Sequence, residues 1–245
     1  MEDVLSGLPP HERRRLEAVP GGDVTDLARR RAEGEPLQYL EGTAPFADFD
    51  VVVDERVLIP RPETEGLYEL AASLAGEPEL IVDLGTGSGV LAIALARRFP
   101  DAEVHAVDIS PAALDVARAN SRRLGTGMHF HEGDLFGPLP DRLRRRVDLL
   151  VANPPYVAAD EWATLPPDVR REPRRALVAG EAGTEVLERI AAGAGEWLSP
   201  GGAVICEMGE TQTEAMERAF SVVGVVTVHS DLAGRPRYVV ARAPT

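Results

Sequence analysis

The chain has 245 residues, a mass of 26.3 kDa and a net charge of −14, from 40 acidic and 26 basic side chains. At roughly 100–200 residues per domain, this length accommodates one full domain and a small appendage. Hydrophobic residues make up 44% and charged residues 27%, which excludes the disordered and collagen-like classes. Because the negative charge would repel a phosphate backbone, direct binding to nucleic acid is not expected.

Secretion and membrane insertion are not expected either. Cys206 is the single cysteine, so no internal disulfide can form, and we expect a small core residue there. The amino-terminal Met-Glu-Asp-Val lacks the basic and apolar regions of a secretory signal, and no stretch approaches about 18 apolar residues. We therefore expect a cytoplasmic protein.

The amino-terminal part is charged and rich in helix signals. Short helices are expected around residues 11–18 and 23–34, with prolines and glycines between them. Residues 46–54 alternate like a strand or a hairpin arm, and the proline-rich turn Ile59-Pro-Arg-Pro-Glu-Thr-Glu65 follows. The expected divisions are a helical substrate-docking cap at 1–42, a β-hairpin and proline-rich linker at 43–66, and the main domain at 67–245.

From residue 79 onward, strand-like runs alternate with helical patterns. Strands are expected at 79–84, 103–108, 128–131, 147–152, 203–207, 225–229 and 238–241, helices at 89–99, 111–124, 184–198 and 211–220, and a turn at 199–202. Repeated strand–helix–strand units require parallel crossovers. The predicted fold is therefore a doubly wound α/β sheet.

A glycine-rich loop joins the first of these strands to its helix, in Val82-Asp-Leu-Gly-Thr-Gly-Ser-Gly89. Glycines let the backbone approach a ligand closely, and the helix start behind them favours a negatively charged group. The spacing differs from the Gly-x-Gly-x-x-Gly of dinucleotide-binding proteins, which argues against NAD. The loop instead resembles motif I of class I methyltransferases, which binds S-adenosylmethionine. That resemblance implies cofactor contacts at Asp83, Gly85, Thr86, Gly87, Ser88 and Gly89.

Acidic residues follow the next two strands. Asp108 ends a strand about 20–25 residues further on, where a carboxylate can accept hydrogen bonds from both ribose hydroxyls. Asp134 and Leu135 follow the third strand, where such enzymes hold the adenine, and Leu135 stands where many relatives have tryptophan. The alternative is that Asp108 and Asp134 only cap the helix or turn that follows.

A buried strand ends in Asn153-Pro-Pro-Tyr156. The prolines stiffen the backbone and donate no hydrogen bond, so the carbonyl groups remain free to accept one. Ligands of open α/β sheets bind beyond the carboxyl ends of the strands. We therefore expect Asn153 to face the same crevice as the glycine loop and to contact both cofactor and substrate. The alternative is a proline-rich turn after a core strand.

This Asn-Pro-Pro-Tyr motif resembles that of methyltransferases that modify planar nitrogens, whose lone pair is delocalised. Asn153 and the Pro154 carbonyl would each accept one N–H of the substrate. Pro155 and Tyr156 are also expected to bind the substrate, and Tyr156 would stack on its planar group or close over it. Asn153, Pro154 and Tyr156 are therefore the expected catalytic residues. Orientation of the substrate nitrogen and electrostatic stabilisation would be sufficient for methyl transfer, so no general base is expected.

Seven segments resemble the HemK/PrmC family of protein-(glutamine-N5) methyltransferases, which act on the Gly-Gly-Gln motif of peptide-chain release factors. They are 35–42 (EPLQYLEG), 57–65 (VLIPRPETE), 83–89 (DLGTGSG), 153–157 (NPPYV), 172–177 (EPRRAL), 200–202 (PGG) and 231–235 (DLAGR). The resemblance implies a class I methyltransferase fold, S-adenosylmethionine as cofactor, S-adenosylhomocysteine as product and a release factor as partner. It also implies that residues 59–65 line the cofactor pocket. The cap is shorter than is usual in this family.

Three other functions stay open: amide methylation of another protein or small molecule, adenine-N6 methylation of nucleic acid, and SAM binding without catalysis. A metal site is not expected. His129 and His131 share one face of a short strand, but no further ligand lies nearby in sequence, so ordinary strand packing is favoured. The arginine clusters have acidic neighbours and are expected to be solvated.

Overall fold

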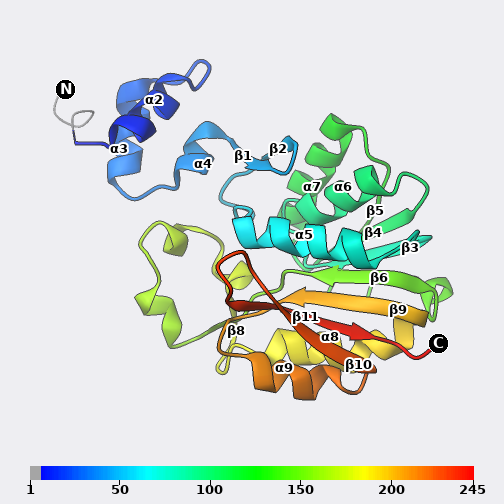
Figure 1. Cartoon of the computed structure of the whole chain (residues 1–245). Helices are drawn as coiled ribbons and strands as arrows, with labels where there is room; N and C mark the ends of the chain where they lie inside the picture. The colour runs from blue at the N-terminus through cyan, green and yellow to red at the C-terminus, as the bar shows by residue number, and fades with distance from the viewer. Residues whose placement is uncertain (1–6) are drawn as a thin grey trace.

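A seven-stranded sheet lies at the centre of the computed structural model, which describes residues 7–245 (Figure 1). Its strands, in spatial order, are β10 (Val225–Ser230), β11 (Pro236–Arg242), β9 (Leu198–Glu207), β6 (Val147–Ala152), β3 (Leu80–Leu84), β4 (Glu103–Asp108) and β5 (His129–Glu132). The five strands from β9 to β5 are parallel. This confirms the predicted α/β fold, with one qualification. β11 runs antiparallel to both neighbours, because the short connection from β10 makes a hairpin and not a crossover.

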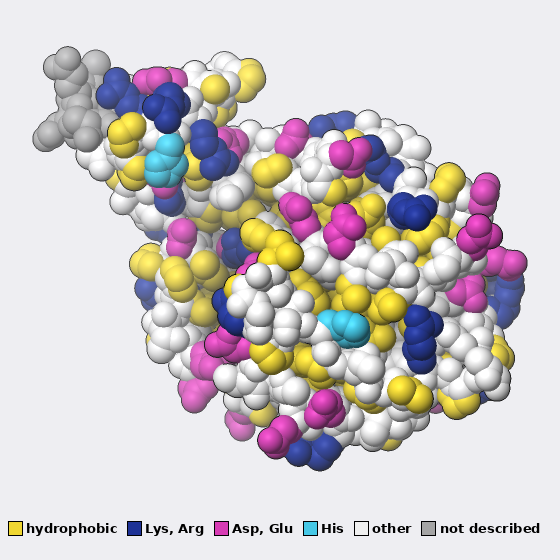
Figure 2. Space-filling model, viewed as in Figure 1, with side chains coloured by type: hydrophobic (Ala, Val, Ile, Leu, Met, Phe, Trp, Pro, Cys, Tyr) yellow, Lys and Arg dark blue, Asp and Glu magenta, His cyan; other side chains and the backbone are white. Residues whose placement is uncertain are grey.

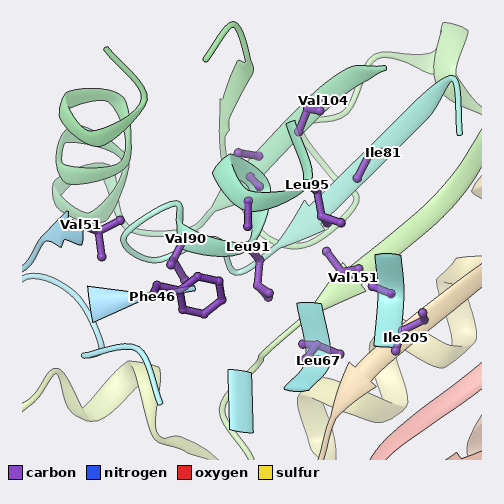
Figure 3. Close-up of a cluster of buried hydrophobic side chains, with 14 of the residues drawn as sticks. Phe46, Val51, Leu67, Ile81, Val90, Leu91, Leu95, Val104, Val151 and Ile205 are labelled. Atoms are coloured by element: carbon purple, nitrogen blue, oxygen red, sulfur yellow. The ribbon is translucent and has the colours of Figure 1, made fainter. Parts of the chain in front are cut away.

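Helices cover both faces of the sheet, which explains why β3 is buried along its whole length. The helices α5 (Pro62–Leu74), α6 (Val90–Arg98) and α7 (Pro111–Leu124) pack on one face, and α8 (Glu185–Trp197) and α9 (Thr213–Phe220) on the other. Successive strand residues point to opposite faces. In Figure 3, Ile81, Val151 and Ile205 of the sheet meet Leu67 and Leu91 of the first helix layer. Cys206 belongs to the opposite cluster and is a buried core residue, as predicted.

Three short helices form a cap that projects from the sheet domain (Figure 1): α2 (Pro10–Glu17), α3 (Val24–Ala32) and α4 (Leu37–Glu41). Leu16, Leu27 and Leu40 belong to its own small core. Ion pairs link its elements, among them Arg31 of α3 with Glu12 of α2 at 2.8 Å. Two of the helices were expected, and α4 was not. Residues 1–6 of the expected cap lie outside the described residues.

A hairpin of β1 (Thr43–Phe46) and β2 (Phe49–Val52) joins the cap to the sheet domain. The β-hairpin expected within residues 43–66 is present. The strand or arm expected at 46–54 spans the turn of that hairpin, since Phe46 ends β1 and the chain turns at Ala47, with φ 49°. Asn120 of α7 accepts a hydrogen bond from the Val52 amide at 2.7 Å and donates to the Val52 carbonyl at 3.0 Å. The same side chain donates to the Ser88 carbonyl at 2.9 Å. The hairpin is thereby attached to the glycine loop.

Two predicted boundaries differ from the structure. α5 begins at Pro62, before the expected linker ends at residue 66, because proline suits the first turn of a helix. The expected turn at 199–202 lies within β9, where pairing with β6 jumps from Val147–Leu198 to Leu149–Ala203. The division of the chain into three parts otherwise stays a prediction.

The segment between β6 and α8 contains short elements that the sequence patterns did not reveal. They are β7 (Val157–Ala158), β8 (Val178–Gly180) and three 3₁₀ turns, η2 (Glu161–Thr164), η3 (Val169–Arg171) and η4 (Arg174–Ala176). A further turn, η1 (Asp141–Leu143), precedes β6. Within residues 7–245, no helix is long and apolar enough to cross a membrane. Acidic and basic side chains are interspersed on the face shown in Figure 2.

Candidate functional site

A cavity of about 340 Å³ lies where β3, β4 and β6 end. The predicted site residues that line it are Gly85, Thr86, Gly87, Ser88, Asp108, Asp134, Leu135, Asn153, Pro154 and Pro155. The glycine loop and the Asn-Pro-Pro corner therefore share one cavity. Three other predicted residues, Asp83, Gly89 and Tyr156, are not part of its lining.

The glycine loop has the shape of a ligand cradle. The amides of Gly85 and Thr86 both donate to the Val107 carbonyl, at 2.8 and 2.9 Å, which ties the loop to β4. Gly85 and Gly87 have φ values of 73° and 56°, and a Cβ on either would meet only open space. Gly89 is required for a different reason, since a Cβ there would lie 3.1 Å from that of Ala117.

Asp83 supports the loop from behind. Its buried carboxylate accepts a hydrogen bond from the Thr86 hydroxyl at 2.6 Å. Burial, which disfavours the charged form, raises the pKa of Asp83 to about 7. The structure thus places Asp83 in the foundation of the loop.

Asp108 and Asp134 have different surroundings. Asp108 accepts hydrogen bonds from the amides of Gly87 at 2.9 Å and Ser110 at 2.8 Å, and burial raises its pKa. Each oxygen keeps a free lone pair for a ligand hydroxyl. Asp134 is half-exposed and pairs with Arg189 at 2.5 Å. The neighbouring Leu135 adopts a left-handed conformation, with φ 48°.

Behind the Asn-Pro-Pro corner lies a chain of hydrogen bonds. Asn153 donates through Nδ2 to the Thr64 hydroxyl at 2.9 Å, and that hydroxyl donates to Glu207 Oε2 at 3.3 Å. The Tyr156 hydroxyl donates to Glu207 Oε1 at 2.9 Å. Burial raises the pKa of Glu207 to about 7. The predicted stacking role of Tyr156 stays a prediction, and the structure gives its hydroxyl a partner that sequence reasoning missed.

Signals for Thr64 and Glu207 were present in the sequence. Thr64 lies in the proline-rich segment 59–65, and Glu207 is an acidic residue at the end of an apolar strand. What the sequence did not show was their contact, because the two residues are 143 positions apart.

The proline-rich linker forms a further wall of the cavity, through Val57, Leu58, Pro60 and Thr64. Glu172, which is buried, accepts a hydrogen bond from the Ile59 amide at 2.9 Å and pairs with the Arg61 guanidinium. Burial raises the pKa of this carboxyl group. Glu172 therefore holds the linker in place against the cavity.

A histidine cluster lies at the sheet edge, away from the cavity lining. Glu103 and His105 of β4 meet His129 of β5, with ligand atoms within 4.8 Å of one another, and His131 lies 2.8 Å from His105. These two β4 residues supply the third histidine and the carboxylate that looked absent from the sequence. The Arg142 guanidinium pairs with Glu103 Oε1 at 2.7 Å, so a metal ion bound by this carboxylate would have to displace the guanidinium. The expectation of no metal stays a prediction.

The same cluster predicts that His105 by itself destabilises the fold in acid. Burial lowers the pKa of His105 to about 4, and the Arg142 guanidinium holds the pKa of Glu103 at about 2. Between about pH 6.5 and pH 4, His105 therefore binds more protons in the unfolded chain than in the folded chain, so its contribution to the free energy of unfolding falls as the pH falls. The buried carboxyl groups of Asp83 and Glu207, whose pKa values are raised to about 7, act in the opposite direction. From His105 alone we expect a loss of about 1–3 kcal/mol between pH 7 and pH 4.5.

Urea unfolding of the wild type and of His105→Gln at both pH values isolates this contribution. Between pH 7 and pH 4.5, the change in the free energy of unfolding of His105→Gln should be more favourable than that of the wild type by about 1–3 kcal/mol. Thr227→Val on β10, which removes no titratable group, should match the wild type. The same pH dependence in His105→Gln and in the wild type would contradict this role of His105.

Comparison with known proteins identifies the family. The family model described as methyltransferase small domain matches residues 67–165. The release factor glutamine methyltransferase of Geobacter sulfurreducens is 43% identical over 199 residues, covering 81% of this chain and 69% of that protein. The enzyme of the same name from Koribacter versatilis is 39% identical over 235 residues, covering 95% and 83%. The chain belongs to the release factor glutamine methyltransferase family.

Solved structures support the fold independently. A methyltransferase from Pyrococcus furiosus superimposes with a TM-score of 0.61 at 16% identity, covering 80% of this chain and 89% of that protein. At this identity the likeness concerns the fold alone. As a member of the release factor glutamine methyltransferase family, the chain is a methyltransferase, which confirms the predicted family, fold and enzyme class.

Proposed function

We propose that the chain transfers a methyl group from S-adenosylmethionine to the side-chain amide nitrogen of a glutamine in a peptide-chain release factor. The observation that carries this proposal is the shared cavity, which holds a ligand cradle and the Asn153–Pro154 acceptors side by side. The names of the relatives support the choice of substrate. A cytoplasmic location, where a release factor would be available, is part of the proposal. With a net charge of −14, no nucleic-acid partner is proposed.

The cavity residues fit the cofactor. The open space at Gly85 and Gly87 suits its amino-acid end, and the Asp108 carboxylate can accept hydrogen bonds from two ribose hydroxyls. Ile109 and Leu135 offer apolar surface to the adenine, and Asp134 is the proposed partner of its amino group. When bound, S-adenosylmethionine supplies a methyl group attached to a positively charged sulfur.

The role of the Asn-Pro-Pro corner is to orient a poor nucleophile. An amide nitrogen shares its lone pair with the adjacent carbonyl, so it reacts only when that lone pair is directed at the methyl carbon. Asn153 Oδ1 and the Pro154 carbonyl can each accept one N–H of the glutamine, which fixes the plane of its amide group. Their partial negative charges also stabilise the positive charge that develops on nitrogen. A N–C bond forms as the S–C bond breaks, and the surplus proton passes to water.

Mass spectrometry of a labelled product tests this function. The protein is incubated with isotopically labelled S-adenosylmethionine and a release factor, and the tryptic peptides are mapped. We expect the label on the glutamine of the Gly-Gly-Gln motif and none on a release factor that carries glutamate there. Label on adenine in added DNA, or on another residue of the release factor, would contradict the proposal.

A further inference from the structure

The series of hydrogen bonds behind the cavity connects three elements that are far apart in the sequence: α5, β6 and β9. The parallel register pairs Ala152 of β6 with Cys206 of β9. The next residues, Asn153 and Glu207, therefore lie at the same level at the carboxyl ends of these two neighbouring strands. Thr64, in the first turn of α5, lies between their side chains. Thr64 and Glu207 are 2% and 1% exposed, so water does not compete freely for these bonds.

The donors and acceptors of this series of hydrogen bonds allow only one direction of donation while Glu207 is ionised. An ionised carboxylate can only accept hydrogen bonds, so the hydroxyls of Tyr156 and Thr64 must both donate to Glu207. The single hydroxyl proton of Thr64 is then used, and its oxygen can only accept. Of the two ends of the Asn153 amide, only Nδ2 can donate to it. This leaves Oδ1 as the end of Asn153 that is free for a ligand.

We propose that Thr64 and Glu207 are positioning residues that hold the Asn153 amide with its oxygen toward the substrate. The inference rests on the proposed function, in which Asn153 accepts an N–H of the glutamine. If the Asn153 amide were rotated by half a turn, its NH₂ group would face the NH₂ group of the substrate, and two donors cannot bond to each other.

The protonation state of Glu207 decides whether this direction holds. A protonated Glu207 can donate to Thr64, which frees the Thr64 proton for Asn153 and allows either amide orientation. Tyr156 and Arg237 face Glu207 and favour its charged form, whereas burial and the nearby Glu63 oppose it, and the net result is a pKa of about 7. Tyr238 lies close enough to feel the charge of Glu207. The Asn153 orientation should therefore be fixed above pH 7 and loosened below it.

Nuclear magnetic resonance can read this orientation without any substrate. Asparagine occurs at positions 120 and 153 alone, so protein labelled with ¹⁵N-asparagine gives two side-chain NH₂ signals. We expect the Asn153 signal to titrate with a midpoint near pH 7, and to stop doing so in Glu207→Gln. The Asn120 signal, whose partners are Val52 and Ser88, should stay constant. An Asn153 signal that is flat from pH 5.5 to 8.5, or that still titrates in Glu207→Gln, would overturn the proposal.

Kinetics provide the second test. Thr64→Val should lower kcat for glutamine methylation by about 10- to 100-fold and change KM for S-adenosylmethionine less than about threefold, because orientation alone is lost. Thr64→Ser keeps the hydroxyl and should stay within about threefold of the wild-type kcat. The matched control is Thr227→Val on β10, which is exposed and remote from the cavity. A wild-type kcat in Thr64→Val would overturn the positioning role.

The two tests separate the inference from the function on which it rests. Failure of the wild-type protein to methylate any glutamine would contradict the proposed function, and the NMR titration would still decide the hydrogen-bond direction.

Discussion

Asn153→Ala is expected to lower kcat for glutamine methylation by about 100- to 1000-fold, the usual effect of removing one oriented polar group from a transition state. The Asn153 oxygen is free to accept a substrate N–H, because the amide nitrogen is already bonded to Thr64. Without that acceptor, the substrate amide can rotate away from the reactive geometry. The affinity for S-adenosylmethionine should change less than about fivefold, since the cradle at residues 85–88 and Asp108 stay in place.

Single-turnover kinetics measure the chemical step, and isothermal titration calorimetry measures cofactor binding. Circular dichroism of the variant should match the wild type, which separates lost chemistry from lost folding. Comparable losses in turnover and cofactor affinity would contradict the orienting role of Asn153.

The second large effect concerns cofactor binding. Asp108→Ala should weaken the binding of S-adenosylmethionine by at least about 150-fold, because a largely buried carboxylate that binds two hydroxyls contributes roughly 1.5–3 kcal/mol for each hydrogen bond, or about 3–6 kcal/mol together. The loss includes the support that Asp108 gives to the Gly87 amide.

Asp134→Ala is the matched comparison. Asp134 is half-exposed and already paired with Arg189, so water screens its interactions. We expect its removal to weaken cofactor binding by less than about tenfold. Titration calorimetry on both variants decides the matter, and a larger loss for Asp134→Ala would reverse the two assigned roles.

Much of the sheet domain could be predicted because its signals are local. Apolar strands of five or six residues alternate with helices, and this pattern can be recognised in the sequence without knowing which residues are in contact. Within the predicted hairpin, the position of β1 was not located, because this strand contains Pro45 and does not alternate clearly between polar and apolar residues. The helix α4 was missed because five residues give too little of a helical period.

The same distinction between local signals and tertiary contacts explains which parts of the site could be predicted. The glycine loop and the Asn-Pro-Pro corner were predicted because each follows a strand, and parallel strands end at one edge of the sheet. The contacts of Thr64, Glu207 and Tyr156 depend on which strands become neighbours and in which register. The histidine cluster depends on the pairing of His105 with His129 across two strands. Such pairings are set by tertiary packing, and no short window of sequence contains them.

The attachment of the hairpin has a consequence for how a partner is recognised. Asn120 fastens β2 beside the loop, the Tyr39 hydroxyl holds the Val57 carbonyl at 2.6 Å, and Arg171 reaches the Glu33 carbonyl at 2.7 Å. Two of these bonds hold the cap itself to the rest of the chain, and the third holds the hairpin that carries it. A protein bound by the cap would therefore lie at a set distance from the cavity. Only a partner with a matching distance between its cap-binding surface and its reactive loop could place that loop in the cavity.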